Sequence, residues 1–206
     1  MNKFITFEGI EGVGKSSVIQ YISEKLKQKN IKTVVTREPG GTNLANKLRD
    51  LVLDNDEELI LPETELLLLL AARKQHVEQF IRPHLKKGYL VISDRFFDAT
   101  YAYQCGGRGL PTSVLEKLNE LIGLNFYPDL TFLLDAPIDI CLERLKHREK
   151  SDRFDREEFE FFKKVQNTYL KRAYAEPNRF LIINCDKDFE KVCKTVLNKL
   201  IQQIIQ

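Results

Sequence analysis

The 206-residue chain has no tryptophan, a single methionine and almost no excess charge of either sign. Its 32 Lys and Arg residues against 30 Asp and Glu residues leave a net charge of +2. Proteins that bind nucleic acid through its phosphates usually carry a basic excess, so we expect no nucleic-acid partner. Any anion that this chain binds must be held by cations gathered at one place.

Paired cysteines and long apolar runs are also lacking. Cys105, Cys141, Cys185 and Cys193 form no C-x-x-C pair, which favours free thiols in a reducing compartment. The longest apolar run, Leu66 to Ala72, is much shorter than the about 20 residues that a membrane helix needs. The segment before the first apolar run is too short for the core of a signal peptide. We therefore expect a cytoplasmic protein with no membrane partner.

The composition is that of a folded protein. Hydrophobic residues make up 43% of the chain and charged residues 30%, which is enough apolar material to form a core. A length of 206 residues is typical of one large domain or of two small ones at most. Because no linker rich in Pro, Gly or Ser interrupts the chain, we expect a single domain over residues 1–206.

Short apolar runs alternate along the chain with longer segments of helical periodicity. Each run is apolar nearly throughout, as in strands whose two faces are both covered by helices. The alternation indicates an α/β fold of three layers, with a five-stranded parallel sheet flanked by helices. The predicted strands are Phe4–Glu8, Thr33–Arg37, Leu90–Asp94, Leu130–Asp135 and Phe180–Asn184. The predicted helices are Lys15–Gln28, Leu44–Leu53, Glu63–Lys86, Thr112–Ile122, Ile138–Arg148, Glu157–Ala175 and a last one from Phe189 to Ile204.

A complete phosphate-binding motif of the P-loop NTPases follows the first predicted strand and opens the first predicted helix. The motif G-x-x-x-x-G-K-[ST] is formed by Gly9, Ile10, Glu11, Gly12, Val13, Gly14, Lys15 and Ser16. The glycines let backbone N–H groups approach phosphate oxygens closely, and the helix N-terminus adds a partial positive charge. Lys15 is expected to reach the β- and γ-phosphates, and the Ser16 hydroxyl to bind Mg²⁺. The sequence therefore predicts a site for a nucleoside triphosphate.

The motif alone leaves the use of the nucleotide open. A switch of the common GTPase type should carry D-x-x-G and N-K-x-D, but the chain has no D-x-x-G, and Asn46-Lys47-Leu48-Arg49 lacks the final Asp. ATP-driven motors and partition proteins are not excluded by this. The other class is a kinase that moves the γ-phosphate to a small acceptor.

Three arginines fall where a second anion would bind. Arg37 closes the second predicted strand, Arg95 follows the third, and Arg73 lies on the long predicted helix. Ligands of open α/β sheets bind outside the carboxyl ends of the strands, where these segments converge. Crowded cations need an anion to offset their repulsion, so this cluster indicates an acceptor that is itself phosphorylated.

The order and spacing of the motifs resemble those of the thymidylate kinase family, in its bacterial form, over residues 4–175. The motifs that carry the resemblance are Phe7-Glu8-Gly9 with the P-loop, Thr36 to Thr42, Ala71-Ala72-Arg73, Asp94-Arg95-Phe96, Ala102-Tyr103-Gln104, Pro128 to Thr131, Leu134-Asp135 and Asp152-Arg153-Phe154. The resemblance implies a homodimer that transfers the γ-phosphate of MgATP to dTMP, giving dTDP and ADP. Another nucleoside or deoxynucleoside monophosphate kinase, or a nucleotide-dependent binding protein, remains the alternative.

The resemblance also implies roles for individual residues. Lys15 and the loop amides would hold the ATP phosphates, while Ser16, Asp94 and Glu8 would hold Mg²⁺ directly or through water. The phosphate of dTMP would lie on Arg95 and Arg73, and the turn Arg37-Glu38-Pro39 along the nucleotide. Thr100 and Gln104 would bond the pyrimidine edge, and Tyr103 would stand where a ribose 2′-hydroxyl has to fit. Without the resemblance, Tyr103 and Gln104 would be read as a helix surface packed on a neighbour.

One position departs from the family pattern. An aromatic ring that stacks on thymine is expected four residues before Arg73, and the chain has Leu69 there. A leucine offers apolar contact but no π-face, so base affinity or selectivity is expected to differ. Leu69 is equally well explained as part of the apolar run of its helix.

A highly charged stretch over residues 147–158 has two interpretations. It is either a solvated connector or a short lid that carries cations over the site, and the resemblance favours the lid. Some family members place an arginine in the P-loop where this chain has Gly12. The transferring phosphoryl group still needs a cation, so we expect the lid to supply it. Arg153 is the first candidate, Arg148 the second and Lys150 a weaker one, because lysine lacks the planar fork of arginine.

Overall fold

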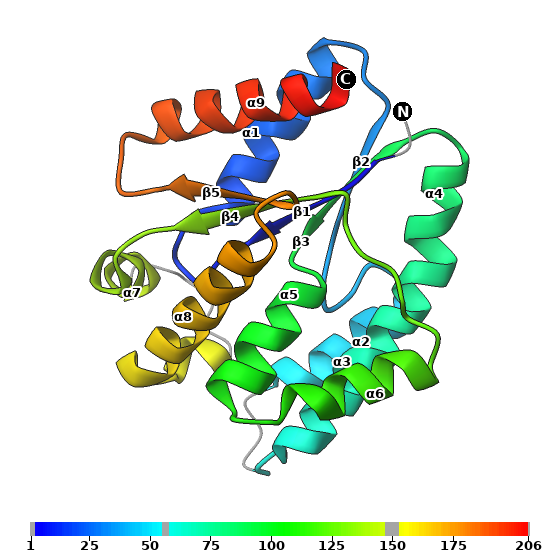
Figure 1. Ribbon diagram of the computed structural model, residues 1–206, viewed down its shortest axis with the longest axis vertical. Coiled ribbons are helices and arrows are strands. Elements are labelled where there is room, and N and C mark those ends of the chain that lie inside the picture. Colours follow the sequence, from blue (N-terminus) through cyan, green and yellow to red (C-terminus); the bar gives the residue numbers. More distant parts are fainter. Residues whose placement is uncertain (1–2, 55–57, 147–152, 206) are drawn as a thin grey trace.

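The computed structural model describes residues 3–54, 58–146 and 153–205, arranged around one five-stranded sheet (Figure 1). The strands are β1 (Phe4–Glu8), β2 (Thr33–Arg37), β3 (Leu90–Asp94), β4 (Leu130–Asp135) and β5 (Phe180–Asn184). They pair in the order β2-β3-β1-β4-β5, and every pairing is parallel. The α/β prediction and the bounds of the five predicted strands are confirmed, because buried parallel strands are apolar along their whole length.

Helices cover both faces of the sheet, as predicted for a three-layer fold. Helices α1 (Lys15–Gln28) and α9 (Phe189–Ile205) lie together on one face (Figure 1). The other face is covered by α8 (Phe159–Ala175) and the helical segments that follow β3. Inward-facing side chains of the central strands form the core between the layers; the rings of Phe7 and Phe132, for example, stack with centroids 5.1 Å apart.

The other helices agree with the sequence prediction in most places. Helices α2 (Asn43–Leu53), α6 (Thr112–Leu121), α7 (Ile138–Lys146) and α8 begin and end within two residues of the predicted bounds. The predicted helix Glu63–Lys86 is instead divided into α3 (Pro62–His76), the π-helical η1 (Val77–Ile81) and α4 (Arg82–Lys86). Pro83 accounts for the change, because it has no N–H to donate and its ring crowds the carbonyl of the preceding turn.

One helical run is absent from the sequence prediction. It consists of α5 (Phe97–Thr100) and the π-helical η2 (Tyr101–Gly107), between β3 and α6. Its polar and apolar side chains are buried alike, including Asp98 and Gln104 as well as Phe97 and Ala102. Because polar and apolar side chains are buried together here, the run has no separate polar face, and no helical periodicity shows in its sequence. This run carries Thr100, Tyr103 and Gln104 on one element.

The strand order brings the predicted motifs to one edge of the sheet. β1 lies in the sheet between β3 and β4, so the strand order reverses at β1. Ligands of open α/β sheets bind at such a point, and here the loop that follows β1 lies there. Asp94 is paired with Phe7 on one side and with Arg37 on the other. The carboxyl ends of β1, β2 and β3 therefore meet beside the P-loop.

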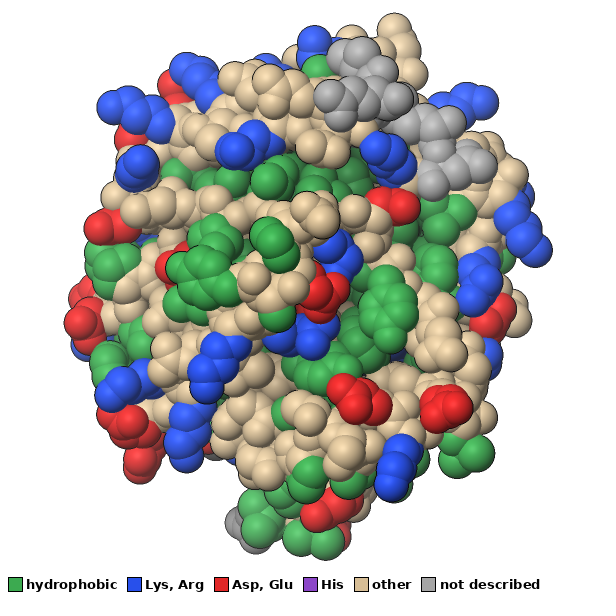
Figure 2. Space-filling view, viewed as in Figure 1, with side chains coloured by type: hydrophobic (Ala, Val, Ile, Leu, Met, Phe, Trp, Pro, Cys, Tyr) green, Lys and Arg blue, Asp and Glu red, His purple; other side chains and the backbone are tan. Residues whose placement is uncertain are grey.

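The lid predicted over residues 147–158 falls only partly within the description. Residues 147–152 lie outside the described residues, whereas Arg153–Arg156 form the 3₁₀ turn η3, which precedes α8. None of the helices formed by the described residues is long and apolar enough to cross a membrane. On the face seen in Figure 2, Lys and Arg side chains are interspersed with Asp and Glu, in keeping with the small net charge.

Candidate active site

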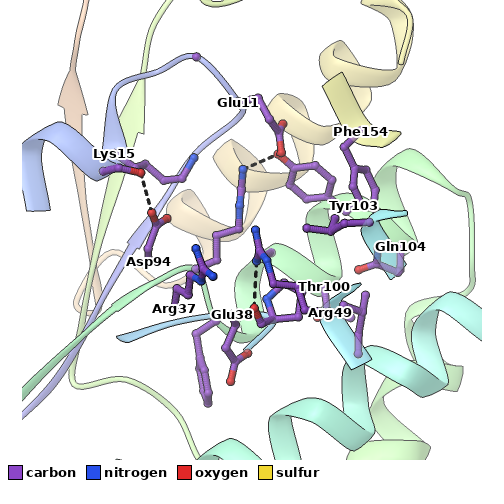
Figure 3. Close-up of a pocket in the computed structure, with 18 of the residues that line it drawn as sticks. Glu11, Lys15, Arg37, Glu38, Arg49, Asp94, Thr100, Tyr103, Gln104 and Phe154 are labelled. Carbon is purple, nitrogen blue, oxygen red and sulfur yellow. Dashed lines mark hydrogen bonds and ion pairs between the residues drawn. The ribbon is translucent and has the colours of Figure 1, made fainter. Parts of the chain in front are cut away.

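A pocket of about 600 Å³ opens at the carboxyl edge of the sheet. The P-loop and β3 form one side of it, and α2, α3 and the α5–η2 run form the other. In Figure 3, Lys15 and Asp94 lie on one side of the pocket and Thr100, Tyr103, Gln104 and Phe154 on the opposite side. The predicted site residues that line it are Glu11, Gly12, Gly14, Lys15, Ser16, Arg37, Glu38, Pro39, Leu69, Arg73, Asp94, Arg95, Thr100, Tyr103 and Gln104.

The P-loop joins β1 to α1 in a conformation that glycine alone adopts readily. Gly14 caps the N-terminus of α1 with φ +98°, and Gly9 has φ +137°. Lys15 folds back over the loop, so that its Nζ donates to the carbonyls of Gly9 and Ile10 at 2.9 and 3.0 Å. Burial, and then repulsion from Arg95, lower the pKa of Lys15 to about 8. The ammonium therefore lies in a poorly hydrated cradle, where a phosphate would replace missing water.

Ser16 and Asp94 come together at the mouth of the P-loop. The Ser16 hydroxyl donates to Asp94 Oδ2 at 3.0 Å. Among the described residues no group of three or more His, Cys, Asp and Glu could hold a metal by itself. Mg²⁺ needs no such group, because it usually binds one or two protein oxygens, several waters and substrate phosphates. This pair of oxygens fits a magnesium ion that arrives with a nucleotide.

Arg95 is held under the P-loop by a network of buried groups. Its guanidinium donates to Gly9 O at 2.7 Å and to a carboxylate oxygen of Glu11 at 2.7 Å, and it lies 4.8 Å from the ring centroid of Tyr103. The Tyr103 hydroxyl donates to the other Glu11 oxygen at 2.5 Å. Arg95 also has φ +68°, a region that costs energy for residues with a side chain. The strained turn directs a cation toward the centre of the pocket.

Arg73 brings a second cation from the opposite wall. Its Nε donates to Glu38 at 2.6 Å and its Nη2 to the carbonyl of Phe96 at 3.0 Å. Glu38 in turn bonds His76 at 3.0 Å, which fixes it from behind. The third nitrogen, Nη1, is buried and has no hydrogen-bond partner among the described residues. Arg73 lines the pocket but is only 4% exposed. An unsatisfied guanidinium donor at a pocket wall fits an anionic ligand.

The far end of the pocket is lined by Thr100, Gln104 and Leu69, with aromatic rings beside them. Tyr103 and Phe154 meet edge to face, with centroids 5.6 Å apart at 88°. Leu69 is 9% exposed and offers an aliphatic surface. Phe154 comes from η3, more than 80 positions after Leu69 in the chain. A flat apolar ligand part would therefore meet aromatic rings here even though position 69 is a leucine.

Comparisons with known proteins agree with this geometry. A sequence model of the thymidylate kinase family matches residues 7–196. The thymidylate kinase of Methylobacillus flagellatus is 46% identical to the chain over 196 residues, which cover 95% of each protein. That of Pseudomonas fluorescens is 44% identical over 203 residues, covering 98% of this chain and 96% of the relative.

The chain belongs to the thymidylate kinase family. A solved structure supports the same assignment: thymidylate kinase from Ehrlichia chaffeensis superposes with a TM-score of 0.77 at 33% identity, over 96% of this chain and 97% of that one. The protein is a kinase that transfers phosphate from ATP to dTMP, and the P-loop NTPase fold is confirmed. A switch or binding protein is not favoured.

The thymidylate kinase fold places some predicted site residues away from the pocket. Gly9, Ile10 and Val13 belong to the P-loop but do not line the pocket; Ile10 and Val13 are each 2% exposed. Glu8, expected as a magnesium ligand, is fully buried. Its two oxygens accept from the backbone N–H of Phe96 and from the hydroxyl of Tyr169, each at 2.7 Å. Both oxygens therefore already accept a hydrogen bond inside the core, and Glu8 does not line the pocket. Its part in holding Mg²⁺ stays a prediction.

Of the expected lid cations, Arg153 lies within the described residues. The guanidinium of Arg153 forms an ion pair with Glu65 and donates to the carbonyl of Val52 at 3.2 Å. Arg153 does not line the pocket in this arrangement, and its expected role at the phosphates stays a prediction. The second candidate, Arg148, and Lys150 lie outside the described residues.

The sequence reasoning missed several residues of the pocket region, among them two arginines. Arg49 and Arg144 line the pocket, with Arg49 donating to Pro39 O at 2.9 Å and Arg144 approaching Gly12 O at 3.5 Å. Phe154 also lines it, and Glu65 lies behind Gln104, 2.7 Å from its amide nitrogen. Arg144 lies on α7, the helix that follows β4, and this position could have pointed to it. Arg49 and Glu65 carry no local signal.

Proposed function

We propose that the pocket holds both substrates of the dTMP kinase reaction in one cavity. ATP phosphates bind the P-loop end, at Lys15 and the loop amides. The dTMP phosphate binds Arg73 and Arg95, and the pyrimidine extends toward Thr100 and Gln104. The pocket connects these residues without interruption, which supports direct transfer between two bound nucleotides.

The unsatisfied Nη1 of Arg73 is the observation that carries the acceptor site. A buried guanidinium nitrogen without a partner costs free energy, and a phosphate oxygen would remove that cost. Glu38 and the Phe96 carbonyl hold the other two nitrogens, so the unpaired N–H has a fixed direction. This preorganised donor supports a phosphate, rather than a neutral group, as the ligand.

The test is Arg73→Lys, which keeps a positive charge but loses the planar fork. We expect the KM for dTMP to rise about 100-fold while the KM for ATP stays within about threefold. Arg82→Lys is the matched control, because Arg82 is 40% exposed and pairs with Glu78 away from the pocket. An unchanged KM for dTMP in Arg73→Lys would contradict the proposal that the dTMP phosphate binds at Arg73.

We propose that Ser16 and Asp94 hold Mg²⁺ in this chain. When bound, the ion supplies positive charge that neutralises the phosphate oxygens of ATP. The chain itself contributes Lys15 and the P-loop N–H groups on the donor and Arg73 and Arg95 on the acceptor. Phosphoryl transfer needs little covalent help from the protein, so positioning and neutralisation by these groups account for the catalysis.

The oligomeric state and the compartment are proposals of the same kind. We propose a homodimer, supported by exposed leucines on the neighbouring helices α2 and α3, where Leu51 and Leu67 are 59% and 55% exposed. Light scattering during gel filtration tests it. We propose a cytoplasmic location, supported by four free thiols, of which Cys141, Cys185 and Cys193 are buried. Fractionation of cells that express the tagged chain tests it.

A further inference from the structure

Glu65 lies behind the base end of the pocket and is completely buried. It stands in the first turn of α3, and its carboxylate receives donors from two later segments. Gln104 Nε2 donates to Oε1 at 2.7 Å. Arg108 Nε lies 3.4 Å from Oε2, and Arg153 forms an ion pair with the same oxygen. Two cations thus accompany one buried carboxylate.

The carboxylate determines how the Gln104 amide is turned. A carboxylate paired with arginines offers only acceptors, so the amide must present its NH₂ to Glu65. Its oxygen is then left for the pocket, which Gln104 lines although only 2% of the residue is exposed. In Figure 3 the oxygen of Gln104 is the atom of its amide that faces the pocket. A buried amide without this partner would have two orientations of similar energy.

We propose that Glu65 is a positioning residue for base selection, acting through Gln104. This inference rests on the proposed contact between Gln104 and the pyrimidine edge. Thymine carries an N–H at ring position 3, which an amide oxygen accepts. Cytosine has a lone pair at that position, which the same oxygen repels. Holding the amide oxygen toward the pocket therefore favours dTMP over dCMP.

The substitution Glu65→Gln changes the control over the orientation of the Gln104 amide while nearly keeping the volume of the side chain at position 65. The new amide has nearly the volume of the carboxylate, but it can accept from Gln104 or donate to it. The amide of Gln104 is then free to present its NH₂ to the pocket, where it would donate to the cytosine lone pair. Selectivity should fall, because a buried polar group rejects the wrong base only while its orientation is fixed.

The experiment measures kcat/KM for dTMP and dCMP on the same enzyme preparation and takes their ratio. The ratio cancels any difference in the fraction of folded enzyme between variants. We expect Glu65→Gln to lower the ratio at least about tenfold. Arg108→Gln is the matched control, because it removes a cation from the same carboxylate but leaves the Gln104 bond in place. There the ratio should stay within about twofold.

A second pair of variants tests whether Glu65 acts through Gln104. Gln104→Leu should lower the ratio by itself, and adding Glu65→Gln to it should cause no further change. If Glu65→Gln leaves the ratio unchanged while Gln104→Leu lowers it, the inference fails and the base contact stands. An equal loss in Arg108→Gln, or a further loss in the double variant, also overturns the inference. If Gln104→Leu alone leaves the ratio unchanged, the proposed base contact fails together with the inference.

Discussion

The backbone of Gly12 packs against the carbonyl of Cys141 so closely that a Cβ on Gly12 would lie 2.1 Å from that oxygen. Gly12 also has φ +73°, which glycine adopts at little cost. The P-loop is thus braced by α7, and the space that a side chain at position 12 would need is filled by helix backbone. In this chain an arginine at position 12 would have no room unless α7 moved.

Replacing Gly12 by alanine should lower both stability and ATP binding. Gly14→Ala is the control for the backbone conformation alone, because Gly14 has φ +98° but no atom of the described residues within 4 Å of an added Cβ. We expect Gly12→Ala to lose at least about 2 kcal/mol more than Gly14→Ala, since overpacking against backbone is poorly relieved. Urea unfolding without nucleotide measures the stability of the two variants. Equal losses of stability in the two variants would mean that α7 shifts easily to make room for the added Cβ.

The cation that serves the transferring phosphoryl group is tested by comparing two arginines. Arg153 is held by Glu65 and Val52, so Arg153→Ala should leave kcat within about tenfold of the wild type. Arg148→Ala should lower kcat by more than about 100-fold, with a much smaller change in the KM for dTMP. Steady-state measurements of kcat and of the KM for dTMP in the two variants show which arginine serves the phosphoryl group. A large fall in kcat for Arg153→Ala would mean that Arg153 leaves Glu65 when both substrates bind.

Tyr103 should determine the preference for deoxyribose. It is 5% exposed and is fixed at its hydroxyl by Glu11 and at its ring by Arg95. Tyr103→Ala should narrow the ratio of kcat/KM between dTMP and the thymine ribonucleotide by about tenfold, since space for a 2′-hydroxyl is created. Tyr103→Phe keeps the ring and should keep the ratio. The role of Tyr103 is packing alone if the alanine variant shows the wild-type ratio.

Glu8 should make the stability of the protein fall as the pH rises through neutrality. Burial, and then repulsion from Asp98, raise the pKa of Glu8 from its ordinary 4.5 to about 7. Between these values the folded protein holds a proton that the unfolded chain does not, so this contribution is complete below the lower value and is lost as the pH passes the higher one.

The variant Glu8→Gln isolates that contribution, because it cannot titrate. We expect the free energy of unfolding of the wild type, relative to the variant, to decrease between about pH 4.5 and about pH 7 and to level off above that range. Urea unfolding of both proteins across this range measures the difference. A difference that is independent of pH would show that Glu8 keeps one protonation state throughout.

Local patterns in the sequence were sufficient for the strands, most helices and the P-loop. An apolar run such as Leu90–Asp94 and a motif such as Gly9 to Ser16 each depend on neighbours in the chain, so their structure follows from short-range rules. The arginines Arg73 and Arg95 could be placed near each other because parallel strands end at one edge. Their role as cations of the pocket also followed from the family resemblance.

The helical run Phe97–Gly107 and the partners of the buried charges were decided by the tertiary structure. Most of that run is buried, and its buried side chains are polar as well as apolar, so it has no periodic pattern. Gln104 meets Glu65 across 39 residues of chain, and Arg153 meets the same carboxylate across 88. Glu8 accepts a hydrogen bond from Tyr169, which is 161 residues away. Such pairings depend on how helices cross over the sheet, and the geometry of that crossing is set by packing of the whole core rather than by any local run of residues.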